Sequence, residues 1–80
     1  MTRAEVQEKV GKALMNVAPE IDLAQLQPDV PFRDQVDLDS MDFLRFVIEL
    51  HKQFAIDVPE TAYPQLASLT GAVWYVQRRT

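Results

Sequence analysis

The chain has 80 residues, of which 48% are apolar, and 12 acidic against 8 basic side chains give a net charge of −4. This length predicts one domain spanning residues 1–80, and the apolar content is typical of a folded domain rather than a disordered one. The chain has no cysteine and one histidine, His51. Disulfides, a thiolate nucleophile and zinc sites built from Cys or His are therefore excluded, and we predict no metal site.

The negative charge argues against nucleic-acid binding, which usually requires a basic surface, and it favours basic partners. The acids concentrate in residues 20–42, where Arg33 is the only base. No apolar run is long enough to cross a membrane, and no signal-peptide pattern opens the chain. We therefore expect a monomeric cytoplasmic protein that does not insert into membranes.

Residues 2–17 are predicted to form the first helix. Thr2 and Glu5 have the spacing of a capping box, in which each side chain satisfies a backbone amide of the other. Gly11 weakens the helix, but its missing side chain permits another helix to cross closely. Pro19 ends the helix near residue 17. The apolar stripe at helical spacing consists of Val6, Val10, Ala13, Leu14 and Val17.

Residues 18–38 are predicted to form a long loop, because prolines and acids are frequent there and no helical period is sustained. Apolar side chains spread through the segment are expected to pin it onto the helices. They are Ile21, Leu23, Leu26, Val30, Phe32, Val36 and Leu38.

Residues 39–54 are predicted to form the second helix, with Asp39 as N-cap and Asp42 placing a further negative charge at the positive helix end. The core stripe comprises Phe43, Phe46, Val47, Leu50 and Phe54. The apolar arc is wider than this stripe, because Met41, Leu44 and Ile48 lie to one side of it. We expect part of that arc to be left for a ligand or partner.

The rest of the chain predicts a short helix and a third main helix. Pro59 suits the first position of a helix, and Pro64 limits that helix to about a turn or two. Residues 68–79 form the last helix, with Trp74 partly exposed and Leu69, Ala72, Val73 and Val76 facing inward. The predicted fold class is all-α: a small helical bundle of three main helices plus one short helix, with a long loop between the first two.

Ser40 is the residue whose role needs explaining. Nucleophilic catalysis requires an adjacent base, but His51 lies eleven residues along the same helix, about 16 Å away at the helical rise. A serine hydrolase is therefore disfavoured. Ser40 is then either a plain first-turn residue or a residue that another enzyme modifies, because a helix N-terminus stabilises an added phosphate.

The order of these features resembles the acyl carrier proteins over nearly the whole chain. An amphipathic helix and a long acidic loop are followed by "LDSMDF", by a helix ending at Phe54, and then by "IDVP" and "LASLTGAVWYV". In that family the Asp-Ser dipeptide at the loop–helix junction carries 4′-phosphopantetheine. The resemblance therefore implies covalent attachment of this cofactor, derived from coenzyme A, at Ser40, with Asp39 recognised by a phosphopantetheinyl transferase.

The resemblance also implies a function. Carriers of this family hold acyl groups as thioesters, for fatty acid, polyketide or related acyl biosynthesis. Acyl-loading, condensing or acyl-transfer enzymes supply the catalysis, so the protein itself is not an enzyme. Two alternatives stay open: an aminoacyl or peptidyl carrier, and an unmodified helical adaptor that binds partners through the helix at 39–54.

The chain departs from the family pattern beside Ser40. Asp37 stands where Gly is common, and Asp tolerates left-handed backbone geometry better than most residues. Met41 replaces the usual Leu and is expected to be exposed to incoming enzymes. The residues expected to contact partners are Asp37, Met41, Asp42, Leu44, Arg45, Ile48, His51, Lys52 and Glu60.

The third departure from the family pattern is the charge on the outer face of the predicted helix at residues 39–54. The corresponding helix of a typical fatty-acid carrier is strongly acidic on its outer face and docks on basic partners. Here that face carries Arg45, His51 and Lys52, with only Asp42 and Glu49 as acids. Because charge sign governs partner choice, we hypothesise a specialised carrier rather than the housekeeping one. Phe43, Phe46 and Phe54 further suggest that the space between helices which stores acyl chains in some relatives is reduced here.

Overall fold

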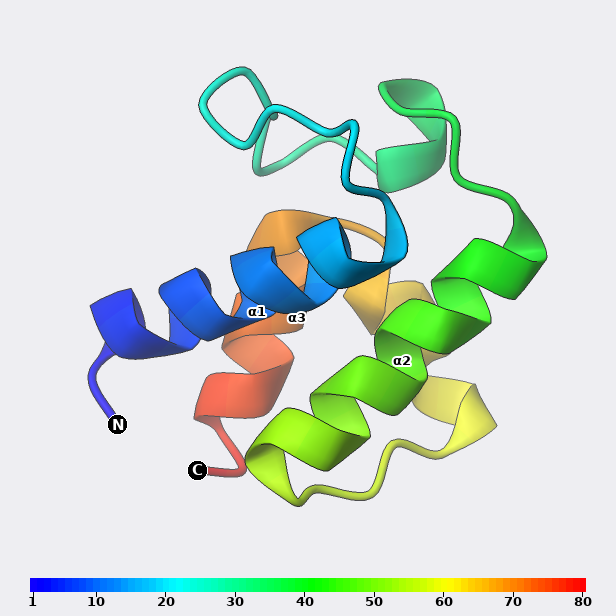
Figure 1. The fold of residues 1–80 in the computed structure, drawn as a ribbon. Coiled ribbons are helices and arrows are strands. Elements are labelled where there is room, and N and C mark those ends of the chain that lie inside the picture. Colours follow the sequence, from blue (N-terminus) through cyan, green and yellow to red (C-terminus); the bar gives the residue numbers. More distant parts are fainter.

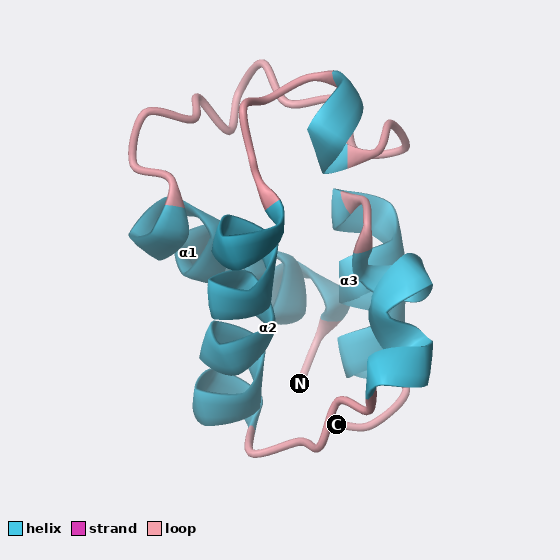
Figure 2. Ribbon diagram, turned by 90° about the vertical axis from the view of Figure 1, so that its right-hand side faces the viewer, coloured by secondary structure: helices cyan, strands magenta, loops and turns pink.

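The computed structural model describes residues 1–80, and it contains helices and loops but no strand. The α-helices are α1 (Arg3–Val17), α2 (Ser40–Phe54) and α3 (Leu69–Gln77), and two 3₁₀ helices are η1 (Phe32–Asp34) and η2 (Glu60–Leu66). The long loop between α1 and α2 arches over the end of the bundle where α2 begins (Figures 1 and 2). The predicted all-α fold, with three main helices and a long first loop, is confirmed.

Each α-helix begins at a polar side chain that accepts a hydrogen bond from a first-turn amide. Thr2 accepts from the amide of Glu5 at 3.2 Å, and Ser68 accepts from the amide of Gly71 at 3.1 Å. Asp39 caps α2 in the same way. The capping box of α1 forms only in part, since the Glu5 carboxylate meets the Thr2 hydroxyl rather than a backbone amide.

Two predicted boundaries need correction. The short helix is a 3₁₀ helix of seven residues, and Pro59 occupies its N-cap position rather than its first helical position. Pro64 lies inside η2. The last helix ends at Gln77 instead of residue 79: the Arg78 amide still bonds to the Trp74 carbonyl, but the Arg79 amide bonds to the Val76 carbonyl, three residues back, so the last turn tightens.

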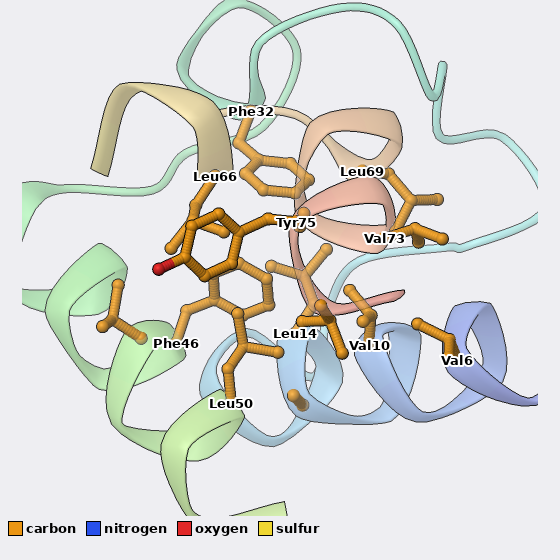
Figure 3. Close-up of a cluster of buried hydrophobic side chains, with 14 of the residues drawn as sticks. Val6, Val10, Leu14, Phe32, Phe46, Leu50, Leu66, Leu69, Val73 and Tyr75 are labelled. Atoms are coloured by element: carbon orange, nitrogen blue, oxygen red, sulfur yellow. The ribbon is translucent and has the colours of Figure 1, made fainter. Parts of the chain in front are cut away.

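The core is made of twenty apolar side chains and holds no buried polar residue. α1 packs against both α2 and α3, while η2 packs against α3. Figure 3 shows Leu14 of α1, Phe46 of α2, Tyr75 of α3 and Leu66 of η2 converging beneath Phe32 of the loop. Val17 and Phe43, expected in the core, are only partly buried and pack against its edge.

Tyr75 is a core residue that the sequence pattern did not indicate. Its side chain is fully buried, its hydroxyl donates to the carbonyl of Asp57 at 3.5 Å, and the Arg79 guanidinium lies 3.6 Å from its ring centroid. The neighbouring Trp74 is 55% exposed, as predicted. α3 therefore buries its tyrosine and turns its tryptophan to solvent.

The loop between α1 and α2 is fastened by side chains as well as by its buried apolar residues. The Gln35 side chain accepts from the Gln27 amide at 2.8 Å and donates to the Gln27 carbonyl at 2.7 Å. The Thr70 hydroxyl donates to Asp29 at 2.6 Å, which ties the loop to α3. The predicted pinning of this loop is confirmed by the burial of Ile21, Leu26 and Phe32.

A side chain at Gly11 and a side chain at Gly71 would meet different neighbours. A Cβ on Gly11 would meet only the end of the flexible Leu23 side chain, at 3.0 Å, so the close neighbour is the loop and not a crossing helix as predicted. A Cβ on Gly71 would fall on the backbone carbonyl oxygen of Gln65, which cannot rotate away.

We predict opposite outcomes for alanine at these positions. Gly71→Ala should lower the free energy of unfolding by about 1–3 kcal/mol, because η2 must shift to relieve the clash. Gly11→Ala should cost little or even stabilise the protein, since the helix gains up to about 1 kcal/mol of propensity. Urea unfolding monitored by circular dichroism measures both, and equal destabilisation by the two variants would contradict this account.

Candidate functional site

Ser40 is the first residue of α2, and the cap in front of it sets its orientation. The Asp39 carboxylate accepts from the amide of Asp42 at 2.8 Å, which is the N-cap bond of the helix. Ser40 itself is exposed, and its hydroxyl makes no hydrogen bond within the protein. The hydroxyl is therefore free to react with a molecule that approaches from solvent.

The first turn of α2 keeps part of its hydrogen-bonding capacity open. Two of the four first-turn amides are satisfied by Asp39: that of Asp42 by its side chain, and that of Phe43 by its carbonyl at 2.9 Å. The amides of Ser40 and Met41 have no acceptor in the protein. Free amides at a helix N-terminus favour a negatively charged group.

A hollow of about 360 Å³ opens beside Ser40. Its lining comes from three elements, since Phe32 and Arg33 belong to η1, Phe43 to α2 and Tyr63 to η2. Arg33 is the one base of the acidic loop, and it lies at this hollow together with Ser40. Neither Arg33 nor Tyr63 was expected at the site, because nothing local in the sequence places either residue next to Ser40.

No histidine lies beside Ser40 to act as a general base. His51 sits in the last turn of α2, where its Nδ1 is 2.6 Å from the Ile56 carbonyl oxygen and 3.9 Å from Asp57. Because a carbonyl only accepts, Nδ1 carries the hydrogen in this contact. His51 thus fastens the chain that leaves α2, and the structure offers Ser40 no activation by it. No group of three or more His, Cys, Asp or Glu side chains is arranged to hold a metal ion.

The outer face of α2 carries an exposed apolar ridge. Met41 is 62% exposed, Leu44 39% and Ile48 44%, at a spacing that aligns them along one side of the helix. Arg45 and Lys52 are exposed on the same helix, and Arg45 lies 4.0 Å from the half-buried Asp42. An exposed ion pair of this length adds little to stability.

The predicted contact residues do not all lie together. Leu44, Ile48 and His51 line a second hollow, of about 520 Å³, between α2 and the start of η2. Asp37 instead lines a hollow with Glu20 and Asp22 on the acidic loop, and Glu60 begins η2. Eight of the nine expected contact residues are exposed, and the ninth, Asp42, is half-buried.

The backbone at Asp37 does not need a glycine. The only residue other than glycine with a positive φ is Ala55, at 53°, which caps the C-terminus of α2 in the left-handed conformation. Asp37 therefore sits in ordinary backbone geometry. The expectation that Asp is tolerated there holds, but for a different reason, since no left-handed conformation is required.

Comparison with known proteins identifies the family. A family model described as "Phosphopantetheine attachment site" matches residues 5–73, which include the whole of α2 and its cap. The chain therefore belongs to the family of proteins with a phosphopantetheine attachment site. Membership implies covalently attached 4′-phosphopantetheine as the cofactor.

The chain is also similar over its length to curated acyl carrier proteins. That of Chlorobium phaeobacteroides is 24% identical over 79 residues, which cover 99% of this chain and 100% of that protein. That of Rubrobacter xylanophilus is 25% identical over 76 residues, covering 95% and 93%. That of Onion yellows phytoplasma is 29% identical over 73 residues, covering 91% and 95%. No helix of this chain is both long and apolar enough to span a membrane.

The cap on α2 yields a stability prediction. Asp39→Ala should lower the free energy of unfolding by about 1 kcal/mol, because the Asp42 amide loses its acceptor, whereas Asp39→Asn should cost much less because Asn caps equally well. Asp37→Ala is the matched control, since Asp37 is exposed and makes no cap bond, and it should be nearly neutral. Denaturant unfolding measures all three, and a neutral Asp39→Ala would show that the cap is not what holds this helix start.

Proposed function

We propose that Ser40 is the attachment point of 4′-phosphopantetheine and that the protein carries acyl groups between enzymes. The observation that supports this best is the free, exposed hydroxyl of Ser40 at the start of α2, inside the matched family region. The other serine of the chain, Ser68, is half-buried, and its hydroxyl is engaged by the Gly71 amide. Only one serine is therefore available without breaking a helix cap.

The residues around Ser40 suit a phosphodiester. The free amides of Ser40 and Met41 offer donors to its oxygens. Arg33, which lies 4.0 Å from Asp34, is the one basic side chain that lines the adjoining hollow. When bound, the cofactor supplies a thiol on which acyl groups are carried as thioesters. The chain has no cysteine, so it contributes no thiol of its own.

In this proposal the chain positions the cofactor and presents a surface, and partner enzymes do the chemistry. A phosphopantetheinyl transferase must reach Ser40 and Asp39, both of which are exposed. Acyl-loading, condensing or acyl-transfer enzymes then dock nearby, on the ridge formed by Met41, Leu44 and Ile48. The protein is accordingly not an enzyme in its own right, and it serves fatty acid, polyketide or related acyl biosynthesis.

Modification of Ser40 is tested by intact mass. We expect the protein incubated with coenzyme A and a broad-specificity phosphopantetheinyl transferase to gain the mass of one phosphopantetheine group. Ser40→Ala should gain none, and Ser68→Ala, the matched control, should gain one group like the natural chain. Failure of the natural chain to react with several transferases would favour the unmodified adaptor. A gain that persists in Ser40→Ala would place the cofactor elsewhere.

We further propose that the charges on α2 select partners other than housekeeping fatty-acid enzymes. Arg45 and Lys52 are exposed on the helix that carries the apolar ridge, where Asp42 and Glu49 are the only acids, and a basic partner patch would meet these two bases with like charge. A partner with acidic groups opposite these two positions and an apolar surface between them fits this face better.

Charge reversal tests this selection. Housekeeping fatty-acid enzymes should load the natural chain less efficiently than their own carrier, and Arg45→Glu with Lys52→Glu should raise kcat/KM by about five- to tenfold by removing like-charge repulsion. Lys12→Glu on α1 makes the same kind of charge change far along the sequence from α2, and it should have little effect. Loading of the natural chain as efficient as that of the enzymes' own carrier would refute the proposal.

A further inference from the structure

Four aromatic rings form a continuous row between the loop, α2 and η2. The ring of Phe32 meets that of Phe46 edge-on, with centroids 5.5 Å apart, and the Phe43 ring lies 6.4 Å from that of Phe46. The row ends at Tyr63, whose ring stands edge-on to Phe43 at 5.8 Å. Edge-to-face pairs at such distances are mutually stabilising, so these rings hold one another in place.

The row lies between the hollow beside Ser40 and the packed interior. Phe43 and Tyr63 are half-buried and line the hollow, whereas Phe46 and Leu66 are fully buried and belong to the core cluster shown in Figure 3. Tyr63 also lines the second hollow, which lies further along α2 than the hollow beside Ser40. A flexible group tethered at Ser40 that enters this hollow therefore contacts Phe32, Phe43 and Tyr63, and the Phe43–Tyr63 pair separates it from the deeper side chains of Leu50 and Leu66 and from the second hollow, which Tyr63 also lines.

The hollow itself suits an apolar group of limited length. Besides its aromatic rings it is lined by Leu38, Pro64 and Ala67, and its charged or polar lining residues are Arg33, Asp39 and Ser40. An acyl chain that entered it would bury apolar surface against these side chains. A longer chain would have to separate two rings that pack against each other.

We propose that Phe43 and Tyr63 determine cargo specificity, by confining the carried group to the hollow beside Ser40 and so favouring short acyl groups over long saturated chains. This proposal rests on the proposed function, since it assumes a cargo tethered at Ser40. In this proposal Tyr63 forms the boundary of the cargo site, and the Phe43 ring holds the Tyr63 ring in place.

The absence of cysteine permits a test that does not depend on any transferase. Ser40→Cys provides one thiol, which is alkylated with a bromoacetyl pantetheine analogue carrying a butanoyl or octanoyl group through a stable amide. Methyl chemical shifts are then compared with and without each chain. Leu38 and Ala67 report on the hollow, Leu50 and Leu66 on the interior, and Val58 on the second hollow.

We expect both chains to shift the methyls of Leu38 and Ala67 and to leave those of Leu50 and Leu66 unchanged. In Tyr63→Ala the octanoyl chain should newly shift Leu66 and Leu50, whereas Tyr63→Phe, which keeps the ring, should behave as the parent does. Trp74→Ala removes an exposed aromatic ring from α3 and serves as the control for general loosening.

Two results would overturn the proposal: octanoyl-dependent shifts of Leu50, Leu66 or Val58 with Tyr63 present, or no shift of Leu38 and Ala67 with either chain. The first result concerns the tethered Ser40→Cys protein alone, so it can be read even if Tyr63→Ala does not fold. Because attachment is chemical, either result is distinct from a failure of Ser40 to accept phosphopantetheine.

Discussion

The structure depends on the hydrogen bond that starts α2. The Asp39 carboxylate accepts from the Asp42 amide at 2.8 Å, and this contact fixes where the acidic loop stops and the helix begins. Because Asp39 is used as the cap, the next residue becomes the first of the helix, with its side chain in solvent and its amide unpaired. A shift of the helix start by one residue would make Ser40 the cap and engage its hydroxyl, as happens at Ser68.

The start of α2 also separates two segments of the chain that carry different charges. The loop before the cap is acidic, whereas in α2 Arg45 and Lys52 are matched by Asp42 and Glu49, so the surface changes from acidic to charge-balanced within a few turns of Ser40. The core of twenty side chains is built without Met41, Leu44 and Ile48. Leaving three large apolar side chains in water is unfavourable in the isolated protein, and this ridge is the surface on which we propose that partner enzymes dock.

Local signals in the sequence predict the α-helices well. Thr2, Asp39 and Ser68 are strong N-cap residues, and the apolar residues that follow them at helical spacing define the buried faces. Features that depend on contacts between distant segments escape such an analysis. Tyr75 is buried because η2 and the loop close over it, and Gly11 is small because Leu23 folds back onto α1.

The residues of the candidate site likewise fall into two groups, those that the sequence indicates and those that only the packing brings to the site. Ser40 and Asp39 are recognisable from an adjacent acid, a helix start and the surrounding pattern. Arg33 and Tyr63 reach the hollow from η1 and η2, which are 3₁₀ segments without a strong sequence period. Their part in the site follows from packing alone, and so does the aromatic row that bounds the hollow.

We propose that the start of α2 holds a phosphodiester on Ser40, and amide spectra of the protein treated with coenzyme A and a phosphopantetheinyl transferase would detect it. We expect the largest shifts relative to the untreated protein at the amides of Ser40 and Met41, and one new phosphorus resonance in the phosphodiester range. Shifts centred on another part of the chain, such as Ser68, or an unchanged spectrum would contradict it.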